Sequence, residues 1–200
     1  MQSKNNNIIV FDLETQLSFD DVGGRDNFRA LKVSVLGAYS YKTNEYLMFE
    51  ERELSKFEEL LAAKPLLVGF NSRKFDCEVL QPYMRMNLAK LPQLDILEEI
   101  VKAVGHRVKL ESVAQATLGS GKSGSGLDAL RYWREGAIDM LKKYCLDDVK
   151  VTRQVYEYGA AHGELLFTSK YGTANSRAVV NWKVEHPDVE EESHKQMSMF

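Results

Sequence analysis

The sequence has few cysteines and no long hydrophobic run. Cys77 and Cys145 are its only cysteines, which is too few for a disulfide framework, and their spacing does not fit a zinc site. No apolar stretch approaches the roughly 18 residues that a membrane-spanning helix needs, and the polar segment MQSKNNN does not resemble a signal peptide. We therefore expect a cytoplasmic protein with free thiols and no contact with a membrane.

The chain also lacks the excess of positive charge that is common in nucleic-acid-binding proteins. Its net charge is −3, but residues 185–200 contain five acids and one lysine and carry −4 of it. The remaining 184 residues therefore have a net charge of +1. Charge neither favours nor excludes a nucleic-acid substrate.

The length of 200 residues and the 44% hydrophobic content fit one globular domain. Residues 185–200 are acidic and poor in apolar side chains as far as Gln196, so we expect a domain over 1–184 and a disordered tail over 185–200. Apolar runs at 8–11 and 65–70 predict buried strands, and 31–41 with 46–49 predict a hairpin. Helical spacing of apolar residues predicts helices over 53–64, 75–87 (kinked at Pro82), 95–104, 110–118, 127–134 and 137–161, and a last strand is expected at 178–184. This order indicates an α/β fold with a mixed sheet.

A glycine-rich segment over 119–126 superficially resembles a phosphate-binding loop. The motif requires a glycine where this chain has Ala116, and it requires a preceding strand where the pattern is helical. We expect a flexible loop instead, from which Lys122 could approach a phosphate backbone.

Acidic residues follow both predicted buried strands. Asp12 and Glu14 lie two apart at the end of the first strand, so their carboxylates point to the same face. Asp76 follows the second strand at the start of a helix. Taken singly, the first pair fits a solvated strand end, and Asp76 fits an acid favoured by the helix dipole.

Tyr144 and Asp148 lie four residues apart on the predicted long helix and therefore share a face. Asp147 is also close to Tyr144, so a surface salt bridge or solvent contact is the simple interpretation of either acid. The apolar neighbours of Asp148 indicate a packed helix, in which an acid needs partners that a cation would supply.

Taken together, these residues resemble the DEDD 3′–5′ exonuclease superfamily. The family carries Asp-x-Glu, then Asn-x-x-x-Phe/Tyr-Asp, then Tyr-x-x-x-Asp; this chain has Asp12-Leu-Glu14, Asn71 through Phe75-Asp76, and Tyr144 through Asp148. A histidine in place of Lys143 would define the other subtype, so the resemblance is to the tyrosine branch. It covers residues 8–160 and implies an RNase H-like three-layer fold with a mixed central sheet and flanking helices.

The resemblance also implies roles for these residues. Asp12, Glu14, Asp76 and Asp148 would hold two divalent cations, Mg²⁺ or Mn²⁺, and Tyr144 would orient the attacking water. Asn71 would position the strand end or contact the nucleic acid, and Asp95 would be structural or support the metal ligands. Two alternatives remain open: a nucleic-acid- or partner-binding module with little or no nuclease activity, and an RNase H-type endonuclease.

Substrate and partner contacts are less well defined by the sequence. Arg131 and Trp133, with Tyr132 and Arg134, could stack on bases or contact phosphates, although a packed tryptophan beside solvated arginines explains the pattern equally well. The segment Gln196-Met197-Ser-Met199-Phe200 resembles the bacterial sliding-clamp binding pentapeptide, with methionines in place of leucines. A frayed or folded-back terminus is the alternative. Clamp binding would favour DNA over RNA as substrate, which no motif otherwise decides.

Overall fold

The computed structural model describes residues 7–119, 126–168 and 175–182. Within this part of the chain, the central sheet has five strands in the order β3-β2-β1-β4-β5. Strand β1 pairs antiparallel with β2 and parallel with β4, while β2–β3 is antiparallel and β4–β5 is parallel. The predicted α/β fold with a mixed sheet is therefore confirmed. The strands are β1 (Ile8–Thr15), β2 (Val33–Ser40), β3 (Glu45–Glu50), β4 (Leu66–Gly69) and β5 (Gln93–Asp95).

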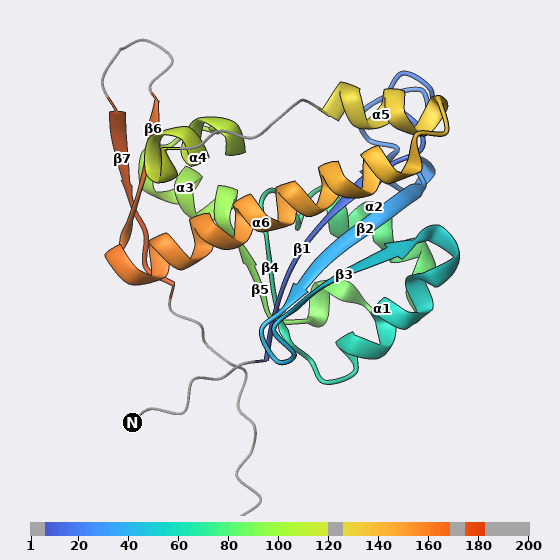
Figure 1. Ribbon diagram of the computed structural model, residues 1–200. Helices are drawn as coiled ribbons and strands as arrows, with labels where there is room; N and C mark the ends of the chain where they lie inside the picture. Colours follow the sequence, from blue (N-terminus) through green and yellow to red (C-terminus); the bar gives the residue numbers. More distant parts are fainter. Residues whose placement is uncertain (1–6, 120–125, 169–174, 183–200) are drawn as a thin grey trace, which may run out of the picture.

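Helices cover both faces of the sheet. The longest, α6, runs diagonally across one face (Figure 1). The helices are α1 (Leu54–Leu61), α2 (Asp76–Leu80), α3 (Ile96–Val104), α4 (Leu110–Leu118), α5 (Gly126–Arg134) and α6 (Ile138–His162). Short 3₁₀ helices are η1 (Phe28–Ala30), η2 (Glu51–Glu53), η3 (Gln81–Tyr83) and η4 (Leu88–Lys90).

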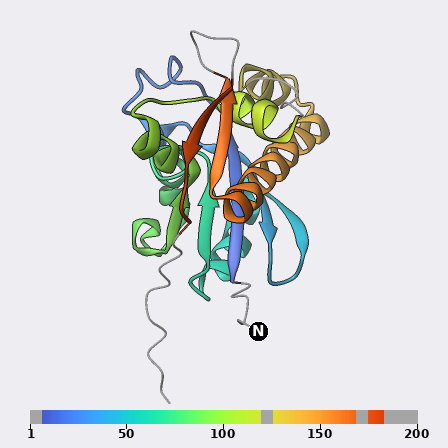
Figure 2. The same ribbon diagram turned by 90° about the vertical axis from the view of Figure 1, so that its left-hand side faces the viewer.

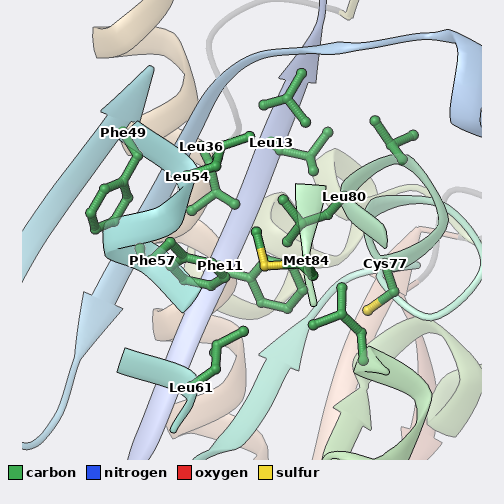
Figure 3. Close-up of a cluster of buried hydrophobic side chains, with 14 of the residues drawn as sticks. Phe11, Leu13, Leu36, Phe49, Leu54, Phe57, Leu61, Cys77, Leu80 and Met84 are labelled. Atoms are coloured by element: carbon green, nitrogen blue, oxygen red, sulfur yellow. The ribbon is translucent and has the colours of Figure 1, made fainter. Parts of the chain in front are cut away.

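The alternation of side chains along β1 divides the core into two layers. Phe11 and Leu13 point into a cluster with side chains of α1 and α2 (Figure 3). Val10 points to the other face, into a cluster with side chains of α3, α4 and α6. Asp12 and Glu14 continue the period of Val10, so the alternation directs both carboxylates toward α6.

A separate hairpin follows α6. Its strands β6 (Glu164–Thr168) and β7 (Asn175–Val179) are antiparallel and, drawn in orange and red in Figure 2, stand in front of the sheet beside α4. The chain then folds back onto α6, where the Trp182 indole N–H donates to the Tyr156 carbonyl oxygen at 3.0 Å. A Cβ on Gly159 would lie 2.5 Å from the indole ring, so glycine is needed for this contact.

Several element boundaries differ from the sequence-based predictions. Helix α2 ends at Leu80 and continues as η3 instead of reaching residue 87, because Pro82 has no N–H for the helical hydrogen bond. Strands β5 and β6 were not predicted, and the last strand is Asn175–Val179 instead of 178–184. None of the helices in the described residues has the length and apolar character needed to cross a membrane.

Candidate active site

The first two acids of the site lie at the end of β1. Asp12 and Glu14 are half-buried on the face that α6 covers. The pairing between β1 and β2 shifts register between Glu14 and Thr15, which is a bulge of the kind that reorients side chains at the end of a strand. The strand thus brings the two carboxylates to one side and ends directly beyond them.

Helix α6 supplies the third acid, and a glycine in β2 allows it to come close. Gly37 pairs with Asp12, and a Cβ there would lie 3.0 Å from Val149 Cγ2 and 3.1 Å from Cys145 Sγ. Asp148, one residue before Val149, is therefore held against the strand that carries Asp12, and it is only 3% exposed. One carboxylate oxygen from each of Asp12, Glu14 and Asp148 lies within 4.8 Å of the other two.

Asp76 lies beside this group of three without belonging to it. Its carboxylate Oδ1 accepts a hydrogen bond from the Leu13 backbone N–H at 3.2 Å, between Asp12 and Glu14 in the chain, and the residue is 4% exposed. Burial raises the pKa of Asp76 to about 8, the charges of Asp95 and Asp148 add to the rise, and the backbone N–H groups of Asp76 and Leu13 oppose it. The structure therefore brings three of the predicted acids together and places the fourth, Asp76, against β1, which carries two of them.

The turn that carries Asp76 toward the site is fixed by Asp95. Asn71 adopts a left-handed conformation (φ 68°), and its N–H donates to Asp95 Oδ1 at 2.8 Å. Asp95 also accepts from the Arg73 N–H at 3.1 Å and from the Leu97 N–H at 3.0 Å, where it caps α3. Asp95 is thus a structural residue of this turn. The Asn71 side chain accepts a hydrogen bond from Arg107 Nη2 at 2.8 Å.

Tyr144 lies one helical turn before Asp148 on α6 and is 6% exposed. Its ring meets the Tyr132 ring of α5 edge to face at a centroid distance of 6.5 Å. Helix α5 packs there through Ala129, which is 1% exposed. The two helices therefore hold the Tyr144 ring beside the acids.

The two predicted substrate-binding residues of α5, Arg131 and Trp133, differ in their exposure to solvent. The Arg131 side chain is exposed, lies 3.4 Å from an Asp128 carboxylate oxygen and has its guanidinium carbon 4.9 Å from the Tyr132 ring centroid. Trp133 is partly buried and packs against the cluster that includes Tyr144, which favours the interpretation as a packed tryptophan. Lys122 and the predicted partner-binding residues Gln196, Met197, Met199 and Phe200 lie outside the described residues.

Gly37 and Arg107 were not recognised from the sequence. A glycine inside a strand often marks a close backbone approach, so Gly37 could have been found. Nothing in the sequence links Arg107 to Asn71, because this contact depends on how two connections lie at the end of the sheet.

The donor set fits a hard divalent cation. Carboxylate oxygens suit Mg²⁺ or Mn²⁺, and carboxylates this close repel one another unless a cation or a proton neutralises them. Cys145 lies nearby, with its thiol donating to the Asp12 carbonyl oxygen at 3.5 Å. Burial raises its pKa well above the ordinary value, and the charges of Asp12 and Glu14 raise it further, so it remains a thiol and not a soft-metal ligand.

Comparison with known proteins agrees with this geometry. No curated protein matches the chain. A family model, that of the RNase H superfamily, matches residues 9–159. This range runs from β1 to the last turn of α6 and includes all four acids and Tyr144. The chain belongs to the RNase H superfamily.

Proposed function

We propose that this protein is a metal-dependent 3′–5′ exonuclease of the DEDD tyrosine type. Its substrate would be a single-stranded 3′ end of nucleic acid, DNA more than RNA. The observation that carries the proposal is the grouping of the Asp12, Glu14 and Asp148 carboxylates within 4.8 Å, with Tyr144 one turn from Asp148.

Asp12, Glu14 and Asp148 would hold the cations, and Asp76 would complete the set from its position against Leu13. Two bound divalent cations would lower the pKa of a water molecule and offset the charge that develops on the phosphate oxygens. Asp76 is kept at the site by the Asn71–Asp95 turn, so this turn sets the position of the fourth acid.

Tyr144 serves to orient the water. A phenol is a weak base at neutral pH, whereas its hydroxyl can hold a water molecule by a hydrogen bond. Packing against Tyr132 restricts the ring, so the hydroxyl is presented in a limited range of positions.

The two alternative functions predict different products. A binding module that has lost catalysis would be expected to lack one or more of the acids, and all four are present here. An RNase H-type endonuclease would cut internally, so it would also cut a strand without ends.

The test incubates the full chain with 5′-labelled single-stranded and duplex DNA and RNA, and with a circular RNA annealed to complementary DNA, in Mg²⁺ or Mn²⁺. We expect a ladder shortened from the 3′ end with release of mononucleotides, no cutting of the circle and complete arrest by excess chelator. Cutting of the circle would support the endonuclease, and binding without cutting in either metal would support the binding module.

A further inference from the structure

Arg107 is an exposed arginine that contacts the turn leading to Asp76. It lies in the connection between α3 and α4, and its guanidinium Nη2 donates to the Asn71 side-chain oxygen at 2.8 Å. Within residues 7–119, 126–168 and 175–182, no carboxylate forms an ion pair with it. Its positive charge is therefore not compensated by the described part of the protein.

Asn71, which contacts Arg107, is held by backbone hydrogen bonds and lies in the turn that leads to Asp76. The Asn71 N–H donates to Asp95 Oδ1, and the Asn71 carbonyl oxygen accepts from the Phe75 N–H at 3.1 Å. The next residue, Asp76, contacts Leu13 between two of the acids. A single turn thus connects the guanidinium to the strand end that carries Asp12 and Glu14.

The connection that carries Arg107 is also held in place. The His106 ring lies edge-on to Phe167 at 5.7 Å between centroids, and its Nδ1 is 3.1 Å from the Val104 carbonyl oxygen. Gly105 ends α3 in a left-handed conformation (φ 78°) that suits glycine. An arginine on such a fixed connection loses little freedom when it binds a ligand.

We propose that Arg107, positioned by Asn71, binds a backbone phosphate of the substrate strand next to the phosphate that is cut. A guanidinium has five N–H donors and Asn71 engages one of its nitrogens, so others remain for the fork-like contact that arginine makes with phosphate. The exposed Lys109, two residues further along, adds a second positive charge. This inference rests on the proposed function, and it assigns Arg107 to substrate affinity and not to the chemical step.

The test compares Arg107→Ala, Arg107→Lys and the control Arg85→Ala in the full chain. Arg85 is exposed, and within the described residues only its backbone N–H makes a hydrogen bond. The probe is a fluorescein-labelled single-stranded DNA 12-mer, with binding followed by anisotropy in Ca²⁺ and turnover measured in Mg²⁺ at several salt concentrations. We expect Arg107→Ala to weaken binding and raise KM about 10-fold with kcat within about two-fold, and to reduce the slope of log Kd against log salt by about 0.7. Lysine should restore the salt slope but only part of the affinity, because it keeps the charge and lacks the fork-like contact.

A structural role for Arg107 gives a different result. In that case Arg107→Ala would lower the melting temperature and kcat through displacement of Asp76 and leave the salt slope unchanged, which overturns the inference. Equal behaviour of Arg107→Ala and Arg85→Ala would overturn it as well. If the wild-type chain binds the 12-mer without cutting it, the proposed function fails and the binding data still decide the role of Arg107. Absence of any binding overturns both.

Discussion

At the scale of single residues, Asp76 is a buried acid that lies beside the group of three carboxylates. It is buried, and the backbone N–H groups of Leu13 and Asp76 stabilise its charge less than water would. Asp76→Asn keeps the accepting oxygen and removes the charge. We expect it to abolish nuclease activity and, in excess chelator, to raise the free energy of unfolding by about 1 kcal/mol or more, which is about 2–4 °C in Tm for a chain of this size. Calorimetry and the nuclease assay check the two effects.

The same residue gives the metal-free protein a pH-dependent stability. Its folded-state pKa of about 8 exceeds its ordinary value of 3.8, so the folded state retains the proton that the unfolded state loses. Stability therefore falls as the pH rises from about 4 to about 8, and the advantage of Asp76→Asn should be larger at pH 8 than at pH 5. Chemical denaturation in chelator at both pH values measures the difference. An advantage that is the same at both would show that the Asp76 charge is stabilised by groups other than those described.

The motif from Tyr144 to Asp148 on α6 leads us to expect graded losses of kcat among its variants. Asp148→Asn should lower kcat by several orders of magnitude, because it removes a proposed metal ligand. Tyr144→Phe should lower kcat on the order of 100-fold, since it removes only the hydroxyl that we propose orients the water. Asp147→Asn is the matched control, because Asp147 is next in sequence and lies outside the group of three carboxylates. Equal damage from Asp147→Asn and Asp148→Asn would show that the motif has been read in the wrong register.

At the scale of elements, the close approach of α6 to β2 determines whether the acids meet. Gly37→Ala would place a methyl group 3.0 Å from Val149 Cγ2 and 3.1 Å from Cys145 Sγ, so these side chains of α6 would have to shift by a few tenths of an ångström, and we expect the helix to shift with them. We expect a loss of about 1–3 kcal/mol in stability and a weaker affinity for Mn²⁺, because Asp148 moves with the helix. Calorimetric titration of Mn²⁺ into the metal-free protein measures the affinity.

The control for this prediction is a second substitution. Val149→Ala removes the Cγ2 atom that the new methyl group would meet, so the double variant should recover part of the Mn²⁺ affinity lost in Gly37→Ala. A double variant with no recovery would show that glycine is needed at position 37 for a reason other than the approach of α6.

The elements that carry the site were predictable from the sequence, and several others were not. Strand β1 begins with a continuous apolar run and helix α6 has a long apolar pattern, and these placed Asp12, Glu14, Tyr144 and Asp148 correctly on their elements. Strand β5 has only three residues, Gln93–Asp95, too few for a pattern, and β6 follows α6 after a single glycine. Neither strand has a local signal strong enough to separate it from its neighbours.

Contacts between distant segments were the least predictable part of the site. Asp95 binds the Asn71 and Arg73 N–H groups across 24 and 22 residues, and Arg107 reaches Asn71 across 36. Such contacts depend on which strand ends lie side by side. The Asp95 contacts exist because β4 and β5 are neighbours in the sheet.

At the scale of the whole molecule, the acid site is separate from an open hollow beside α4 and α6. This hollow, of about 410 Å³, is lined by residues of α4 and α6, among them Leu118, Glu157 and His162. None of the four acids of the candidate site lines it. Glu157 is already bound by Arg153 and by the Tyr41 hydroxyl. The acids instead lie between β1, α6 and the α5 side of the fold.

The segment Gln196-Met197-Ser-Met199-Phe200 leads to a prediction about partners. It resembles the sliding-clamp binding pentapeptide, whose leucines are replaced here by Met197 and Met199, and methionine has a similar volume and enough flexibility to fill a leucine pocket. We propose that this segment binds a bacterial sliding clamp, which would raise the concentration of the nuclease near DNA that is being copied or repaired. A clamp tether also favours DNA as the substrate.

A peptide of residues 186–200, titrated calorimetrically against a bacterial sliding clamp, tests this proposal. We expect a Kd in the micromolar range, as is common for short docking peptides, and at least 10-fold weaker binding by Gln196→Ala and by Phe200→Ala, because each removes an end of the motif. Glu190→Ala is the matched control, since it lies in the same peptide outside the motif and should leave the affinity unchanged within about two-fold. Binding that depends on Glu190 as strongly as on Phe200 would show that general acidity attracts the peptide. No binding at high micromolar concentration would leave the substrate preference to be decided by the active site alone.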